Sequence, residues 1–247
     1  WEGKGVCHQV MMENYVCPGE LIFGADSHTC SYGALGAFGT GVGCTDLLYG
    51  MVTGKSWVLV PETVKFNLVG KLPEGVYARD LILTIIGTIG ANGCNYQVME
   101  FTGEGAKTLS ISERMVLCNM AVEAGAKTGI FEPDEKAIEY LEAHGRKPKA
   151  LFTSDPDAVY AREYTFDLSK IRPVVAKPDF VDNLVPAEEV RGVKIDEAFL
   201  GSCNNGRIED LRVGASLLKG RHVAEKVRFL VVPASQTVYL QALKEGL

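Results

Sequence analysis

Hydrophobic positions alternate along the chain between short runs typical of strands and longer stretches with helical spacing. Leu21–Ala25 is a short apolar run, and Thr63–Val69 alternates apolar and polar residues with the two-residue period of a half-buried strand before Gly70. Asp80–Ile89 is apolar on almost every side, which predicts a buried helix. Trp57–Val60 is apolar and short enough to be a buried strand. Short strands that alternate with helices predict an α/β fold.

Helix boundary signals place further elements along the chain. Ser110–Glu113 has the spacing of a capping box, which predicts a helix from there to about Ala124, where Gly125 ends it. Pro133–Asp134 predicts the start of another helix, which ends near His144–Gly145. The remaining predicted elements are a strand near 163–168, a linker near 178–183, strands at 195–200 and 227–232, and helices at 207–218 and 236–244.

Composition and charge restrict the class of protein. The 247 residues are 47% hydrophobic and 23% charged, which is typical of a soluble globular protein. The net charge is −6, and Lys and Arg form no basic stripe, so we expect no nucleic-acid partner. No apolar run reaches the roughly 18 residues that a membrane span needs, so we expect none.

The cysteines and the chain ends carry further information. The seven cysteines are an odd number and include no C-x-x-C pair. Because no secretion signal is visible either, the sequence favours a reduced, cytoplasmic protein over a disulfide framework. Trp1 in place of Met, and the abrupt end at Leu247, lead us to expect that the chain is a piece of a longer protein.

A first candidate for chemistry is Gly24–Thr29, which directly follows a predicted strand. Polar groups just past the carboxyl end of a strand lie where open α/β sheets place their ligand sites. Asp26 and His28 are two residues apart, so the carboxylate can orient the imidazole and stabilise its charge for acid–base chemistry. The same spacing also fits a purely structural Asp–His turn, and spacing alone favours that interpretation.

The glycines that follow this segment do not predict a nucleotide site. No G-x-G-x-x-G between positions 33 and 43 lies between a strand and a helix. Gly54–Ser56 is similar to the end of a P-loop, but Tyr49 stands where that loop needs its first glycine. We therefore expect these glycines to allow close backbone packing around Asp26 and His28.

Four other polar residues stand out. Asn119 and Glu123 are four residues apart and share a helix face, and apolar neighbours suggest that Glu123 is partly buried and partnered. Cys203 lies between a strand and a helix, where the helix N-terminus favours a thiolate. His8 precedes Gln9 near the chain start. Each of these features alone is more often structural, solvated or inert.

Taken together and in order, the motifs resemble those of the aconitase family. The matching segments are His8–Gln9, Glu13–Tyr15, Pro18–Gly19, Gly24–Thr29, Cys118–Met120, Glu123, Gly125–Ala126, Gly201–Cys203 and Asn205–Arg212. Ala25–Cys30 and Gly206–Arg212 are most similar to the branch that contains 3-isopropylmalate dehydratase and homoaconitase. Asn204 departs from the pattern, since the family usually has Thr there, and this departure leaves the substrate open.

The resemblance implies roles for individual residues. The implied catalytic residues are Asp26, His28, His8 and Glu123, and the implied substrate-binding residues are Ser27, Asn119 and Asn205. Cys203 is implied as the first of three ligands to a [4Fe–4S] cluster, with the other two in a C-x-x-C beyond Leu247. One thiolate cannot hold such a cluster, so we expect it in the complete protein but not in this segment, which we expect to be inactive alone.

The resemblance also implies a fold, a reaction and a partner. We expect truncated aconitase-like three-layer α/β/α domains with parallel-rich sheets: the rest of a first domain (1–62), a second domain (63–182) and the beginning of a third (183–247). The implied activity is a hydro-lyase that isomerises a 2-hydroxy di- or tricarboxylic acid by dehydration and rehydration. The implied partner is a small swivel-domain subunit. We expect 3-isopropylmalate of leucine biosynthesis first, homocitrate second, and citrate or a methylmalate third.

Two alternatives from other classes of protein remain open. The chain can be a scaffold without a cluster that only docks the small subunit. It can also bind RNA, as iron-regulatory relatives do, although its acidic balance argues against this.

Overall fold

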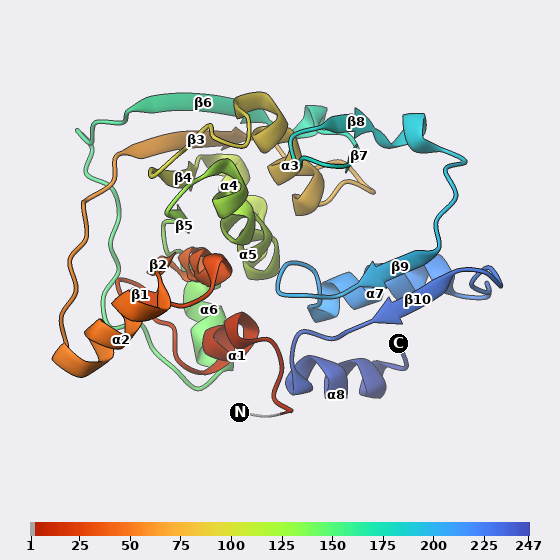
Figure 1. The fold of residues 1–247 in the computed structure, drawn as a ribbon, viewed down its shortest axis with the longest axis horizontal. Coiled ribbons are helices and arrows are strands. Elements are labelled where there is room, and N and C mark those ends of the chain that lie inside the picture. The colour runs from red at the N-terminus through yellow and green to blue at the C-terminus, as the bar shows by residue number, and fades with distance from the viewer. Residues whose placement is uncertain (1–2) are drawn as a thin grey trace. The chain divides into compact units, whose positions relative to one another are not determined.

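The computed structural model describes residues 3–247, whose helices and strands are labelled in chain order in Figure 1. Contacts divide the chain into two compact units. We call Val16–Val190 the central unit, and residues up to Tyr15 together with Arg191–Leu247 the terminal unit. A division into three domains at residues 62 and 182 stays a prediction.

The central unit is built on a parallel four-stranded sheet with the order β5-β4-β3-β6. Its strands are β3 (Thr63–Val69), β4 (Val98–Thr102), β5 (Thr128–Phe131) and β6 (Arg162–Asp167). Its helices are α3 (Ala78–Ile89), α4 (Glu104–Thr108), α5 (Ile111–Asn119) and α6 (Glu135–Ala143). Parallel strands joined by helices confirm the predicted α/β class.

One row of aromatic side chains crosses this sheet. Phe131, Phe101, Phe66 and Tyr164 are register partners on β5, β4, β3 and β6. The ring centroids of Phe66 and Phe101 are 5.6 Å apart, and those of Phe101 and Phe131 are 5.1 Å apart. Such pairs add to the stabilisation from burial. The period-two alternation of β3 thus places a fully buried ring at the centre of the unit.

A second pair of parallel strands begins the central unit. β1 (Leu21–Gly24) pairs with β2 (Phe38–Gly41), and the 3₁₀ helix Ser27–Leu35 connects them. Helix α2 (Cys44–Thr53) follows and has no buried residue. At the other end of the unit, β7 (Val174–Ala176) and β8 (Leu184–Pro186) form an antiparallel pair, with 3₁₀ helices at Leu168–Lys170 and Ala187–Val190.

The predicted strand at Trp57–Val60 is wrong. These residues form no strand, and the exposed fractions of Trp57 and Val60 are 79% and 85%. A short apolar run satisfies the pattern of a buried strand, but it needs a neighbouring strand to pair with, and the central unit offers none here.

The helix predicted from the capping box at Ser110 is confirmed, with a change of geometry inside it. Ser110 and Glu113 cap each other's backbone N–H groups, and α5 runs to Asn119. The chain then tightens into the 3₁₀ helix Met120–Ala124, which carries Glu123. Gly125 ends it with a φ of 78°, a left-handed conformation that glycine adopts without strain.

The terminal unit combines the beginning and the end of the described chain. It contains α1 (Cys7–Asn14), β9 (Glu197–Leu200), α7 (Ile208–Leu218), β10 (Arg228–Val231) and α8 (Gln236–Glu245). β9 and β10 are parallel, and α7 provides the crossover connection that a parallel pair needs. Ala234 ties two segments together, because its N–H donates to the carbonyl of Gly206 and its carbonyl accepts from the N–H of Val6.

Candidate active site

The Asp26–His28 turn lies directly after β1. Asp26 caps the 3₁₀ helix Ser27–Leu35, and its Oδ1 accepts a hydrogen bond from the backbone N–H of His28 at 2.8 Å. The glycines around the turn let other backbone segments approach it. A Cβ at Gly41 would lie 2.8 Å from the carbonyl oxygen of Asp26, and one at Gly39 would lie 2.3 Å from that of Thr29. Close backbone packing is therefore what these glycines provide.

His28 lies between two carboxylates. Its Nδ1 is 3.7 Å from Oδ1 of Asp26, and its Nε2 is 3.8 Å from Oε1 of Glu123. Both distances exceed a hydrogen bond, so the contacts are ion pairs that require a protonated imidazole. The neighbouring Glu123 raises the pKa of His28, partial burial opposes this, and the charge of Asp26 adds to the rise. All three side chains stay partly exposed, at 31% for His28, 56% for Asp26 and 42% for Glu123.

Arg79, at the start of α3, also acts on this group. The neighbouring His28 lowers the pKa of Glu123 most, and the positive charge of Arg79 lowers it further. Arg79 is exposed. Sequence reasoning missed this residue, because nothing in its local motif indicates that α3 packs against the 3₁₀ helix of Glu123.

Asn119 contacts the turn through Ser31. Its side-chain amide donates to Oγ of Ser31 at 2.9 Å, and Ser31 Oγ donates to the carbonyl of His28 at 2.7 Å. The thiol of Cys30 lies 3.3 Å from the carbonyl oxygen of Asn119. Asn119 is 1% exposed, so it supports the helix that carries His28, and its direct contact with a substrate stays a prediction. Sequence reasoning did not single out Ser31.

A cavity of about 350 Å³ lies beside the turn. Asp26 and Ser27 form one part of its wall, and the segments Thr40–Gly43 and Gly125–Lys127 form others. Its lining combines backbone and small apolar side chains with the Asp26 carboxylate, two hydroxyl side chains and Lys127, and it does not include His28 or Glu123. The size and the mixed lining suit a small polar molecule.

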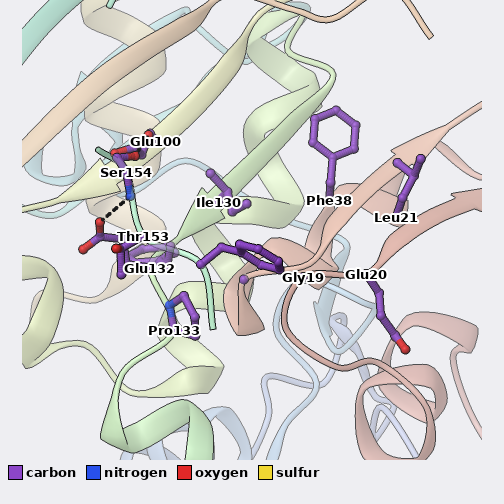
Figure 2. A pocket seen from close by; sticks show the side chains of 13 residues that line it. Gly19, Glu20, Leu21, Phe38, Glu100, Ile130, Glu132, Pro133, Thr153 and Ser154 are labelled. Atoms are coloured by element: carbon purple, nitrogen blue, oxygen red, sulfur yellow. Dashed lines mark hydrogen bonds between the residues drawn. The ribbon is translucent and has the colours of Figure 1, made fainter. Parts of the chain in front are cut away.

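Another cavity in the central unit, of about 290 Å³, contains none of the predicted site residues (Figure 2). Its acidic lining residue Glu100 is 8% exposed and accepts hydrogen bonds from Ser154 and Tyr160, each at 3.0 Å. The backbone N–H of Ser154 donates to Glu132, as Figure 2 shows. These carboxylates have structural partners, so the candidate chemistry lies at the Asp26 cavity.

Cys203 lies in a loop between β9 and α7 of the terminal unit. Arg207, which is 3% exposed, donates from Nη1 to the carbonyl of Cys203 at 3.0 Å and from Nη2 to the carbonyl of Asn204. The predicted substrate ligand Asn205 donates its amide to Asp210 at 2.8 Å. Ser202 has a φ of 75°, which is rare for a residue with a side chain. The loop is thus held in a specific conformation around the thiol.

His8 lies in α1 of the same unit and is 3% exposed. The neighbouring Glu13 accepts hydrogen bonds from Gln9 at 2.9 Å and from Ser235 at 2.7 Å. These bonds join α1 to the start of α8.

The structure brings Asp26, His28 and Glu123 together within the central unit. His8, Asn205 and Cys203 belong to the terminal unit, and their convergence with His28 stays a prediction. Within residues 3–247, no three His, Cys, Asp or Glu side chains are grouped to hold a metal ion. That Cys203 is a cluster ligand stays a prediction. None of the helices in this range has the length and apolar character needed to cross a membrane.

Comparison with known proteins decides the family. The family model described as "Aconitase family (aconitate hydratase)" matches residues 1–192 and 181–247. The chain belongs to the aconitase family. The two matched ranges together cover the whole chain, and the roles of Asp26, His28 and Cys203 in it stay predictions.

Several curated aconitase-family relatives are about half identical to the chain. A 3-isopropylmalate dehydratase large subunit from Hydrogenobaculum sp. is 53% identical over the whole chain. Two proteins of Methanothermobacter thermautotrophicus, a probable 3-isopropylmalate dehydratase large subunit and a probable methanogen homoaconitase large subunit, are 54% and 50% identical over 99% and 98% of the chain. The chain spans 57–58% of the length of these relatives.

Proposed function

We propose that the chain is part of the large subunit of a hydro-lyase that isomerises a 2-hydroxy di- or tricarboxylic acid by dehydration and rehydration. The observation that supports this most is His28, held between Asp26 and Glu123 beside a cavity for a small molecule. We propose 3-isopropylmalate as the first candidate substrate, because two of the relatives described above are named as large subunits of 3-isopropylmalate dehydratase. Homocitrate is second, in line with the homoaconitase relative, and citrate or a methylmalate is third.

The proposed chemistry of His28 follows from its charge. Dehydration expels hydroxide, a poor leaving group, so an acid must protonate the departing oxygen. Two flanking carboxylates raise the pKa of His28 and favour the imidazolium, which can donate that proton. Glu123, itself kept ionised by His28 and Arg79, then stabilises the ring as it is reprotonated for the next turnover.

The other site residues complete the proposal. Asp26 orients His28 through its backbone N–H, and Ser27 and Asn205 contact the substrate. His8 belongs to the acid–base network. Cys203 is the first ligand of a [4Fe–4S] cluster in the complete protein. Because residues 3–247 contain no group of three side chains that could hold a metal, we assign no step to that cluster, and we propose that the chain of 247 residues alone is inactive. A small subunit is the proposed partner, and the proposed location is the cytoplasm.

The test of His28 uses the complete large subunit with its small subunit and its cluster. We expect His28→Ala to lower kcat by roughly 100- to 10,000-fold, because general acid catalysis is lost. The visible absorbance of the cluster reports whether its environment is intact, and it should not change. The matched control is His222→Ala, since His222 is exposed in the terminal unit. Full turnover by His28→Ala would remove His28 from this role.

A second experiment separates the enzyme from the scaffold and from an RNA-binding protein. Iron, sulfide and the small subunit are added to the chain of 247 residues and to the complete large subunit, and turnover is measured. If the mixture with the complete large subunit turns over substrate and the mixture with the 247-residue chain does not, the proposal is supported. If both chains bind the small subunit and neither mixture turns over substrate, the scaffold is supported. A salt-dependent RNA mobility shift would support RNA binding instead.

A further inference from the structure

The cavity beside the Asp26 turn raises a problem of charge. A hydroxy dicarboxylate brings two negative charges to a wall that already contains the Asp26 carboxylate, with Glu123 paired to the same His28. Like charges within a few ångströms repel each other, and partial exclusion of water strengthens this repulsion. A substrate of this class therefore needs a cation on the wall of the cavity.

Two of the cations near the turn are already engaged with carboxylates. His28 pairs with Asp26 and Glu123, and the charge of Arg79 acts on Glu123. Their positive charges are balanced by these two anions before any substrate enters. They leave little net charge to offset a second carboxylate of the substrate.

Lys127 is the cationic residue in the lining of the cavity. It is half-buried and immediately precedes β5. Among the ion pairs of residues 3–247, none involves Lys127, and its Nζ lies 5.2 Å from the ring centroid of Tyr96. A cation–π contact holds an ammonium in place without neutralising its charge.

The backbone around this pair is fixed. The N–H of Tyr96 donates to the carbonyl of Gly125 at 2.9 Å, and the N–H of Lys127 donates to the carbonyl of Gln97 at 2.8 Å. Tyr96 has a φ of 60°, a left-handed conformation that costs a residue with a side chain of order 1 kcal/mol or more. The surrounding bonds maintain this conformation, which keeps the ring under the ammonium.

We propose that Lys127 binds a carboxylate of the hydroxy acid in the Asp26 cavity, with Tyr96 holding its side chain in place. This inference rests on the proposed function, because it assigns one subsite for the proposed substrate class. The ligand it requires is a carboxylate, and the interaction it assigns is a charge-assisted hydrogen bond from the ammonium.

The test compares lysine variants in the complete enzyme with 3-isopropylmalate as the probe. We expect Lys127→Met to raise KM by roughly 10- to 100-fold, the range of a hydrogen bond to a charged group. The kcat should change by less than about threefold, because the carboxylate is bound equally before and during the reaction. Lys127→Arg retains the charge but not the shape of the ammonium, so its KM should lie between those of the wild type and Lys127→Met.

The controls separate a subsite from a structural role. Lys149→Met is the matched control, since Lys149 is exposed in the same unit and pairs with Glu20 at 2.8 Å, and it should leave KM unchanged. In the analogues, one or the other carboxylate of the substrate is replaced by a carboxamide. One of the two analogues lacks the carboxylate that Lys127 binds. For that analogue, Lys127→Met should raise KM far less than it does for the diacid.

Each outcome decides the inference. A KM for Lys127→Met within twofold of the wild type overturns it. A loss of the same size in Lys127→Arg, or an equal loss for both carboxamide analogues and the diacid, assigns Lys127 a structural role and also overturns it. If Lys127→Met does not fold, Lys127→Gln takes its place with the same expectations. If the wild-type enzyme turns over none of the candidate acids, the proposed function fails and the subsite fails with it.

Discussion

The central and terminal units bury their apolar side chains to very different extents. The central unit contains a row of aromatic rings on four parallel strands, and Phe66, Leu81 and Ile85 are fully buried there. The core cluster of α7 and α8 in the terminal unit consists of Leu211, Val238 and Ala242, all of them still slightly exposed. An apolar cavity of about 310 Å³ adjoins this cluster. The two candidate loops therefore stand on supports of different strength.

The loops themselves reflect this difference. The His28 turn is braced from outside by Asn119 of α5, through Ser31. The Cys203 loop is held by side chains close to it in sequence, since Arg207 donates to its carbonyls and Asp210 accepts from Asn205. A group that transfers protons benefits from a rigid scaffold, because a small displacement lowers the rate steeply. This contrast teaches that the proposed acid–base part of the site is supported by a packed core, and the thiol loop mainly by local hydrogen bonds.

The largest expected effect on this comparison comes from the aromatic row. We expect Phe66→Ala to lower the free energy of unfolding of the central unit by about 3–5 kcal/mol, through lost burial and the cavity it leaves. Hydrogen exchange of the β4 amides measures this unit separately. In the terminal unit, Phe199→Ala should cost less than about 1 kcal/mol, because Phe199 is 55% exposed. Equal losses would mean that the two units do not differ in packing.

A buried ion pair gives the next largest effect. Arg114 is 1% exposed and donates to both carboxylate oxygens of Asp134, at 2.8 and 2.5 Å. Arg114→Met should destabilise the central unit by about 3 kcal/mol, because Asp134 loses its partner in a partly buried site. Arg212→Met removes a similar two-point contact with Glu245 on the surface of the terminal unit, and the loss should be much smaller. Hydrogen exchange of the amides in each unit measures both losses. If Arg212→Met costs as much stability as Arg114→Met, burial does not decide the strength of these ion pairs.

The smallest effect concerns the electrostatics of the His28 turn. Glu123→Gln should lower the pKa of His28, because it removes the carboxylate that raises it most, and Asp26→Asn should lower it less. The raised pKa of His28 stabilises the folded protein fully at low pH, and this stabilisation is lost as the pH rises through the folded-state pKa. Because Glu123→Gln lowers that pKa, the stabilisation should be smaller in this variant and should be lost at a lower pH. NMR titration of the His28 ring measures the shift. Glu163→Gln, which affects only a pair with Lys65, is the control.

Local signals in the sequence predicted much of the fold. The alternation of β3, the capping box at Ser110 and the glycine after Glu123 depend on residues close together in the chain, and the structure confirms all three. The strand predicted at Trp57–Val60 is wrong, because a strand needs a partner strand that no local pattern reveals. The sequence left two interpretations of Asp26 open, a structural turn and a partner for His28. In the structure its carboxylate caps the turn and also lies beside the imidazole of His28.

The parts of the site that the sequence did not predict are long-range contacts. Ser31 and Asn119 are 88 positions apart, and only the packing of α5 against the 3₁₀ helix brings them together. Arg79 and Lys127 are single cations in ordinary local surroundings. Their relation to Glu123 and to the cavity depends on how α3 and β5 pack, which hydrophobic periodicity does not specify.

The pairing of Gly5 with Ser235, and of Glu13 with the hydroxyl of Ser235 across 222 positions, affects the order in which the protein can fold during synthesis. As the ribosome extends the chain, residues 3–15 emerge long before the strand and helices that they adjoin. Residues 16–190 can fold in that interval, and their collapse shortens the loop whose closure entropy the late pairing must overcome. Until then, the Glu13 carboxylate of α1 lacks the hydroxyl of Ser235 that donates to it in the folded protein.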